Sequence, residues 1–190
     1  PATTGLLDIL SPTALQFQMR NIINGELQQR VIAIIDYPER VAPSWLSRIA
    51  TLPGVITSIH ATPTDPYDLI EQLNVSIGDL EGRVIEGGKH LVVERAKTQL
   101  EGAKHLIKKI DAEAQGVFFV TVLILVSAYD QDELLRRCRR VESVLAAAGM
   151  RGRAPVFRQE EAFRSVGPYR MLEPEIEQIA ARNMPVETLA

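Results

Sequence analysis

Residues Val117–Tyr129 read VFFVTVLILVSAY, the most apolar stretch of the chain. The stretch is too short to be a membrane-spanning helix, which needs about 20 apolar residues. It is rich in valine, phenylalanine and isoleucine, and Gly116 precedes it. A short apolar run of this composition is typical of a strand that is buried on both faces. It therefore predicts a core strand, around which the other elements are arranged.

Three other segments predict further core strands: Arg30–Tyr37 (RVIAIIDY), Val55–Thr62 (VITSIHAT) and Arg151–Gln159. Their β-branched and apolar residues are typical of strands. Nearer the N-terminus, Ala14–Asn21 alternates weakly, and Asn24-Gly25 is a turn signal. We expect this segment to form a hairpin with Arg30–Tyr37, through a loop longer than the tightest hairpin type.

Two helices would connect these strands. Ser44–Leu52 predicts a short helix, with its first residue as the N-cap and Pro53-Gly54 as its stop. Asp130 can cap a second helix that runs to about Ala148. The core face of this second helix comprises Leu134, Cys138, Val141 and Leu145. Cys138 is therefore expected to be a small buried side chain rather than a nucleophile.

A long helical region separates the second and third strands. Asp65-Pro66 opens it with a capping residue and a proline at the first helical position. Gly87-Gly88 divides it into two halves. In each half, apolar residues recur at steps of three or four: Leu69, Leu73, Ile77, Leu80 and Val84, then Val93, Ala96, Leu100, Ala103, Ile107 and Ile110. Two helices with one narrow apolar seam each predict an antiparallel helical hairpin that projects from the domain.

The order of elements is strand, helix, strand, hairpin, strand, helix, strand. This order predicts an α+β fold with a ferredoxin-like split βαβ core and an antiparallel sheet, with the helical hairpin inserted at residues 65–114 between its two halves. An N-terminal strand pair would be added to this core. We expect an N-terminal extension at residues 1–29, the ferredoxin-like domain at 30–164, and a linker at 165–190.

No segment of the sequence carries a complete catalytic or metal-binding set. Gly82–His90 resembles a phosphate-binding loop only superficially, because its lysine is misplaced, no serine or threonine follows the lysine, and no strand precedes the loop. The three histidines, His60, His90 and His105, are scattered and lack accompanying cysteines or a carboxylate cluster. We therefore expect no catalytic residue, cofactor or metal in this chain.

The charged residues suggest a different kind of site. The net charge is -3 and aromatic residues make up 5% of the chain, which together disfavour nucleic-acid binding. Four arginines gather on the helix after the third strand: Arg136, Arg137, Arg139 and Arg140. One interpretation is an ordinary solvated helix face. The other is a contact surface for an acidic partner or for anionic lipid headgroups.

The C-terminal third carries the strings FRQEEAFRS at Phe157–Ser165 and RNMPVETLA at Arg182–Ala190, with Pro168 between them. Three motifs precede them: Asp36-Tyr37-Pro38, Pro43-Ser44-Trp45-Leu46 and Leu52-Pro53-Gly54. In order and spacing, these motifs resemble the N-terminal domain of the conjugative-transfer ATPases of type IV secretion systems. That family includes the TraC and TrbE proteins and the fourth VirB protein. The resemblance covers about Arg30–Ala190.

The resemblance implies a non-catalytic docking and assembly domain of a larger ATPase. The Walker motifs, with their ATP and magnesium, would follow after Ala190. It also implies a cytoplasmic location at the inner face of the cell membrane, a hexameric parent protein, and other type IV secretion components as partners. The residues alone leave two alternatives open: a free-standing ferredoxin-like regulatory or protein-interaction module, and a nucleic-acid-binding domain that uses the arginine patch.

Overall fold

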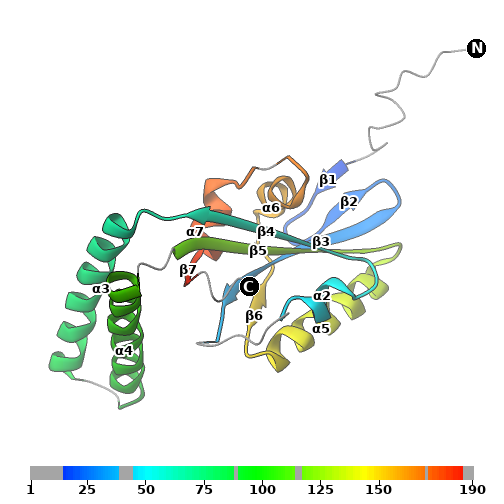
Figure 1. Ribbon diagram of the computed structural model, residues 1–190. Coiled ribbons are helices and arrows are strands. Elements are labelled where there is room, and N and C mark those ends of the chain that lie inside the picture. Colours follow the sequence, from blue (N-terminus) through cyan, green and yellow to red (C-terminus); the bar gives the residue numbers. More distant parts are fainter. Residues whose placement is uncertain (1–14, 39–44, 88–89, 114–116, 170, 186–190) are drawn as a thin grey trace, which may run out of the picture. The chain divides into compact units, whose positions relative to one another are not determined.

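The computed structural model describes residues 15–38, 45–87, 90–113, 117–169 and 171–185 of the protein. In these residues, a seven-stranded sheet and six helices form an α+β fold (Figure 1). The chain divides into two compact units. One comprises residues 1–60 and 120–182, and the other comprises residues 61–119 and 183–190.

Four strands form the ferredoxin-like core that the sequence predicts: β3 (Leu27–Asp36), β4 (Val55–Pro63), β5 (Val117–Ala128) and β6 (Arg151–Arg153). Their order in the sheet is β6-β3-β5-β4. β3 pairs antiparallel with β5 on one edge and with β6 on the other. The first and third core strands are therefore the two central ones, as in a split βαβ fold.

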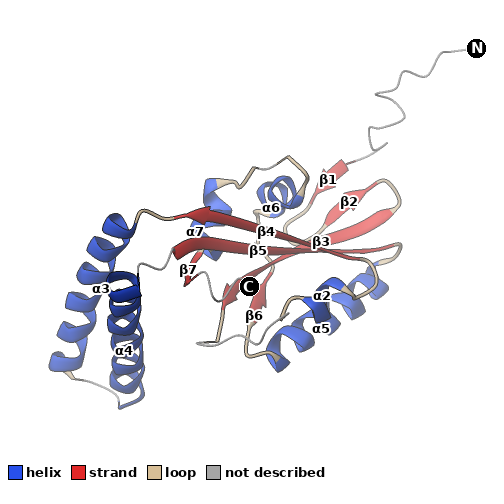
Figure 2. Ribbon diagram, in the orientation of Figure 1, coloured by secondary structure: helices blue, strands red, loops and turns tan. Residues whose placement is uncertain are grey.

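Helices cover both faces of the sheet in the first unit (Figure 2). On one face, α5 (Gln131–Ala147) packs on β3 and β6, where Leu145 and Ile32 both lie next to Gly152, and the short α2 (Ser47–Ala50) lies against α5. On the other face, α6 (Gln159–Val166) and α7 (Pro174–Ala180) bury apolar side chains against alternate residues of β3 and β5. The cluster includes Val31, Ala33, Leu123 and Leu125 of the two strands and Ala162, Val166, Ile176 and Ala180 of the two helices.

The apolar stretch that begins at Val117 forms β5, the predicted buried core strand. In β5, Val120 and the residues from Val122 to Ile124 have no exposed surface. Successive side chains of a strand point to opposite faces. Because helices cover both faces of this strand, most of its positions are apolar, and the buried Thr121 is an exception. Phe118 and Phe119, at the start of β5 in the second unit, are half-buried.

The N-terminal strands differ from the expectation in their pairing and in their turn, since the strand within Ala14–Asn21 does not pair directly with β3. β1 (Leu15–Phe17) pairs with β2 (Ile22–Asn24), and β2 pairs with β3 so that Asn24 lies opposite Leu27. The predicted long loop is therefore wrong, because only two residues connect β2 to β3. Gly25 makes this turn possible with a φ of +60°, a conformation that costs glycine little.

The end of the fourth core strand and both ends of the first helix were also predicted wrongly. The strand expected at Arg151–Gln159 ends at Arg153, and Gln159 is the first residue of α6. Pro155 lies between them, and it has no N–H to donate to a continuing ladder. The helix expected at Ser44–Leu52 is shorter, and its proposed cap Ser44 lies outside the described residues.

The predicted linker at residues 165–190 contains two ordered elements in its described part. α7 buries Ile176 and Ala180 completely, and β7 (Arg182–Pro185) pairs with β5. The Ser165 hydroxyl donates to the Glu161 carbonyl and accepts from the backbone N–H of Glu173, across the α6–α7 connection. The described part of this segment is therefore packed against the rest of the chain.

Gln159 fills a gap in the sheet. β5 occupies one edge of β3, so β2 and β6 share the other, opposite residues 27–29 and 33–36 respectively. Val31 lies between these two stretches. Its N–H donates to Oε1 of Gln159 (2.9 Å), and its carbonyl accepts from Nε2 (3.2 Å), which also donates to the carbonyl of Pro155 (3.1 Å). The side-chain amide thus replaces a missing strand residue.

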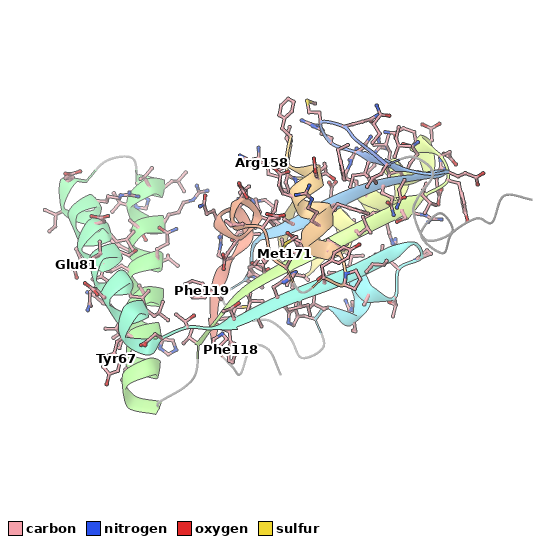
Figure 3. The ribbon with its side chains drawn as sticks, turned by 90° about the horizontal axis from the view of Figure 1, so that it is seen from above. Tyr67, Glu81, Phe118, Phe119, Arg158 and Met171 are labelled. Atoms are coloured by element: carbon pink, nitrogen blue, oxygen red, sulfur yellow. The ribbon has the colours of Figure 1, made fainter. Side chains whose placement is uncertain are left out.

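The second unit contains the predicted helical hairpin, formed by α3 (Pro66–Glu86) and α4 (His90–Glu113). Asp65 caps α3 by accepting the N–H of Tyr67 (2.8 Å). Every described seam residue is buried or half-buried, with Leu69, Leu80 and Ala96 the most enclosed. Figure 3 shows Tyr67 near the start of α3 and Glu81 further along, where Glu81 pairs with Lys104 of α4 (2.7 Å).

Replacing Gln159 with leucine should destabilise the protein by about 2–4 kcal/mol. The change leaves the N–H and C=O of Val31 buried without partners, and each such group costs about 1–3 kcal/mol. Gln131→Leu is the matched control, because Gln131 is also the first residue of its helix but is exposed. Urea unfolding measures both variants. Equal stability of the two variants would contradict the role assigned to Gln159.

Leu100→Asp should destabilise the hairpin and leave the sheet of the first unit intact. Leu100 is half-buried in the seam between α3 and α4, where a charged carboxylate would be partly removed from water. In hydrogen exchange, protection of the α3 and α4 amides should fall by about tenfold or more, whereas the amides of β3 should keep theirs. Gln99→Asp, at an exposed neighbouring position, is the control. Equal loss of protection in β3 would show that the two units unfold together.

Candidate functional site

The candidate site is the exposed side of α5. Asp130 caps this helix by accepting the N–H of Glu133 (2.8 Å). The predicted core face is confirmed, since Leu134, Cys138, Val141 and Leu145 are all buried. Residues three and four apart lie on one side of a helix. Arg136, Arg139 and Arg140 therefore share the solvent side, and Arg137 lies at its margin.

Arg137 makes internal contacts. Its Nη1 donates to the carbonyl of Ser127 at the end of β5 (2.6 Å), and its Nε donates to Oε1 of Glu133 (2.8 Å). Gly54 packs against the same group, because a Cβ at this position would collide with Nη1 of Arg137. The carbonyl of Gly54 in turn accepts the N–H of Ser127 (2.8 Å). Arg137 therefore joins α5, β5 and the loop before β4.

Arg136 is exposed but paired. Its Nη2 lies 2.7 Å from Oε2 of Glu133, whose other oxygen holds Arg137. Hydrogen bonds from Arg137 and Arg136 lower the pKa of the Glu133 carboxyl, and the bond to Glu133 raises the pKa of Arg136. At an exposed position, such pairs contribute little stability. The single negative charge of Glu133 thus offsets one of the two positive charges of Arg136 and Arg137.

Arg139 and Arg140 are different, because no hydrogen bond or ion pair joins either to another residue of the described ranges. Both are exposed. The arginines that follow in the sequence are mostly paired: Arg151 with Asp36, Arg158 with Glu161 and Glu175, and Arg164 with Glu160 and Glu173. The unpaired positive charge of α5 is therefore concentrated on two neighbouring guanidinium groups.

The other residues that the sequence singled out are not brought together. Nε2 of His60 lies 2.7 Å from the carbonyl of Ser165, whereas His90 and His105 are exposed on α4. Within the described ranges, no cluster of three or more potential metal ligands occurs. Burial raises the pKa of the Cys138 thiol, which disfavours the reactive thiolate.

The glycine-rich stretch at the hairpin does not follow a strand. Gly82 lies inside α3, and Gly87 is the C-cap of that helix with a φ of +72°. Gly88 and Lys89 lie outside the described residues. The context that a phosphate-binding loop requires, a strand leading into the loop, is replaced by a helix end.

Comparisons with known proteins give a limited result. No family model matches the chain. An uncharacterised protein of Bacillus anthracis, pXO2-09, is 18% identical over 152 residues, which make up 80% of this chain and 24% of that protein. The chain thus spans only a fraction of that relative's length. Separately, within the described residues, none of the helices combines the length and the apolar character that crossing a bilayer requires.

Arg137→Ala should destabilise the protein by about 1–2 kcal/mol, because it removes charged hydrogen bonds to the carbonyl of Ser127 and to Glu133. Arg140→Ala, on the same helix, should change stability by less than about 0.5 kcal/mol, since its side chain is exposed and unpaired among the described residues. Thermal unfolding of both variants measures the difference. Equal effects would show that the contacts of Arg137 carry no net stability.

Proposed function

We propose that this chain is a non-catalytic docking and assembly domain of a type IV secretion ATPase that powers conjugative transfer of DNA or protein. The observation that carries the proposal is the ordered series of motifs from Asp36-Tyr37-Pro38 to Arg182–Ala190, which resembles that family. In this view ATP and magnesium bind elsewhere in the parent protein.

The structural roles of these motifs support the proposal. In the string Phe157–Ser165, Gln159 completes the edge of β3, and Ala162 and Ser165 are buried. Tyr37 and Trp45, from two of the earlier motifs, stack edge to face with centroids 5.8 Å apart. Motifs that hold a fold together are expected to recur in proteins that share the fold, whatever partner each protein binds.

The arginine face of α5 suits the docking role. Arg139 and Arg140 present two exposed cations on a helix that the sheet holds rigidly. Such a pair can contact acidic groups of other secretion components, or of a neighbouring subunit in a hexameric parent. It can also contact anionic lipid at the cytoplasmic face of the membrane. The length of pXO2-09, of which the aligned part is 24%, is compatible with further domains beside this one.

In the full-length parent protein, the double substitution Arg139→Glu and Arg140→Glu should lower the frequency of conjugative transfer by about tenfold or more. A loss of about 1.4 kcal/mol in docking free energy corresponds to that factor. The ATPase rate of the purified parent should stay unchanged. Arg95→Glu, at an exposed position on α4, is the matched charge reversal.

Unchanged transfer by the double variant, with normal expression, would contradict a docking role of this face. The parent reading frame tests the wider proposal independently. A Walker A motif downstream of Ala190 is expected there. Its absence would contradict the assignment to a secretion ATPase and would favour a free-standing module.

A further inference from the structure

Phe157 occupies a backbone position that disfavours it. Residues Pro155 to Arg158 form a turn that leads from β6 to α6, closed by the N–H of Arg158 and the carbonyl of Pro155 (3.3 Å). Phe157 is the third residue of this turn and has a φ of +61°. A positive φ at this position normally requires glycine or asparagine. Within the described residues, no other residue except glycine has a positive φ.

The side chain of Phe157 gains little from this position within the chain itself. Phe157 is 76% exposed, so its ring contributes little to the core. Its backbone N–H donates to the carbonyl of Met19 (2.8 Å), in the turn between β1 and β2, and Met19 is 47% exposed. A backbone hydrogen bond would form equally well with glycine or asparagine. The turn therefore holds an aromatic ring in solvent at a conformational cost, and the fold does not account for the ring.

Two arginines adjoin Phe157 and Met19 in the sequence, and only one of them is paired within the described ranges. Arg158, labelled in Figure 3, is held by Glu161 (3.0 Å) and Glu175 (3.6 Å). Arg20, which follows Met19, is exposed and has no partner among the described residues. The unpaired charge that follows Met19 in the sequence is therefore positive. Phenylalanine, methionine and arginine are also residue types that are enriched in protein interfaces.

We propose that Phe157, Met19 and Arg20 form a docking site for a short segment of a partner protein that carries apolar side chains next to a carboxylate. The ring would insert between the apolar side chains, and Arg20 would pair with the carboxylate. The small size of the site favours a short segment. A phenylalanine buries at most about 250 Å², whereas stable dimers bury about 800 Å² on each partner. This inference is independent of the ATPase proposal.

The first experiment tests whether the positive φ of Phe157 destabilises the chain. Phe157→Asn should leave the melting temperature of the chain unchanged or raise it by about 2–4 °C, because asparagine tolerates a positive φ. The control is Tyr129→Asn, which removes an aromatic residue that is 78% exposed but has no positive φ. Its melting temperature should not rise. A fall of several degrees for Phe157→Asn would show that the ring supports the fold, and would overturn the proposal.

The second half uses a phage-displayed library of random 12-residue peptides, selected against the 190-residue chain with counter-selection against Phe157→Asn. Enriched peptides should combine apolar residues with aspartate or glutamate. Chosen peptides should bind Phe157→Asn and Arg20→Glu at least about tenfold more weakly, and Tyr129→Asn with unchanged affinity. Failure to enrich such peptides, or equal binding to Phe157→Asn, would overturn the proposal.

Two further measurements distinguish other occupants of the site. Sedimentation velocity tests whether the chain associates with itself, and flotation with vesicles of 70% phosphatidylcholine and 30% phosphatidylserine tests membrane binding. Neither should depend on Phe157. Self-association or vesicle binding that is lost in Phe157→Asn would replace the peptide segment with a second copy or with a lipid surface.

Discussion

The fold depends on how the backbone hydrogen bonds along one edge of β3 are completed. β3 is central to the sheet, yet along one edge two different strands cover only its two ends. The side-chain amide of Gln159 supplies the donor and the acceptor between them, and it is almost fully buried. Because an unpaired buried peptide group is costly, this one residue fixes where α6 docks. It also links the N-terminal strands to the C-terminal helices.

The sequence predicts the elements whose signals are local. The continuous apolar run of β5, the seams of α3 and α4, and the caps Asp65 and Asp130 all follow from periodicity and side-chain chemistry, and the structure confirms them. The wrong boundaries have two kinds of cause. β6 ends at Arg153, two residues before Pro155, which is a local signal. Gln159 belongs to a helix instead of a strand, and its side-chain amide pairs with Val31, 128 residues away in sequence. No local pattern encodes that contact.

The candidate site was likewise predicted only in part from the sequence. Sequence spacing places four arginines on one helix, but it cannot show which of them are already engaged. The structure separates them: Glu133 holds Arg136 and Arg137, the latter also bracing β5, and Arg139 and Arg140 remain exposed. The position of Phe157 was equally hidden, because its residue type suits a strand and only its φ reveals the turn. The candidate partner-binding residues are therefore those whose unpaired charge or backbone conformation the fold itself does not require.

The base of the helical hairpin has an evolutionary consequence. The N–H of Thr64 donates to the carbonyl of Val117 (2.9 Å), so a backbone hydrogen bond joins the residue before the helical hairpin to the first residue of β5. The entropic cost of closing such a loop grows only slowly with its length. The hairpin can therefore lengthen, shorten or be exchanged among related chains while the register of β4 and β5 stays the same.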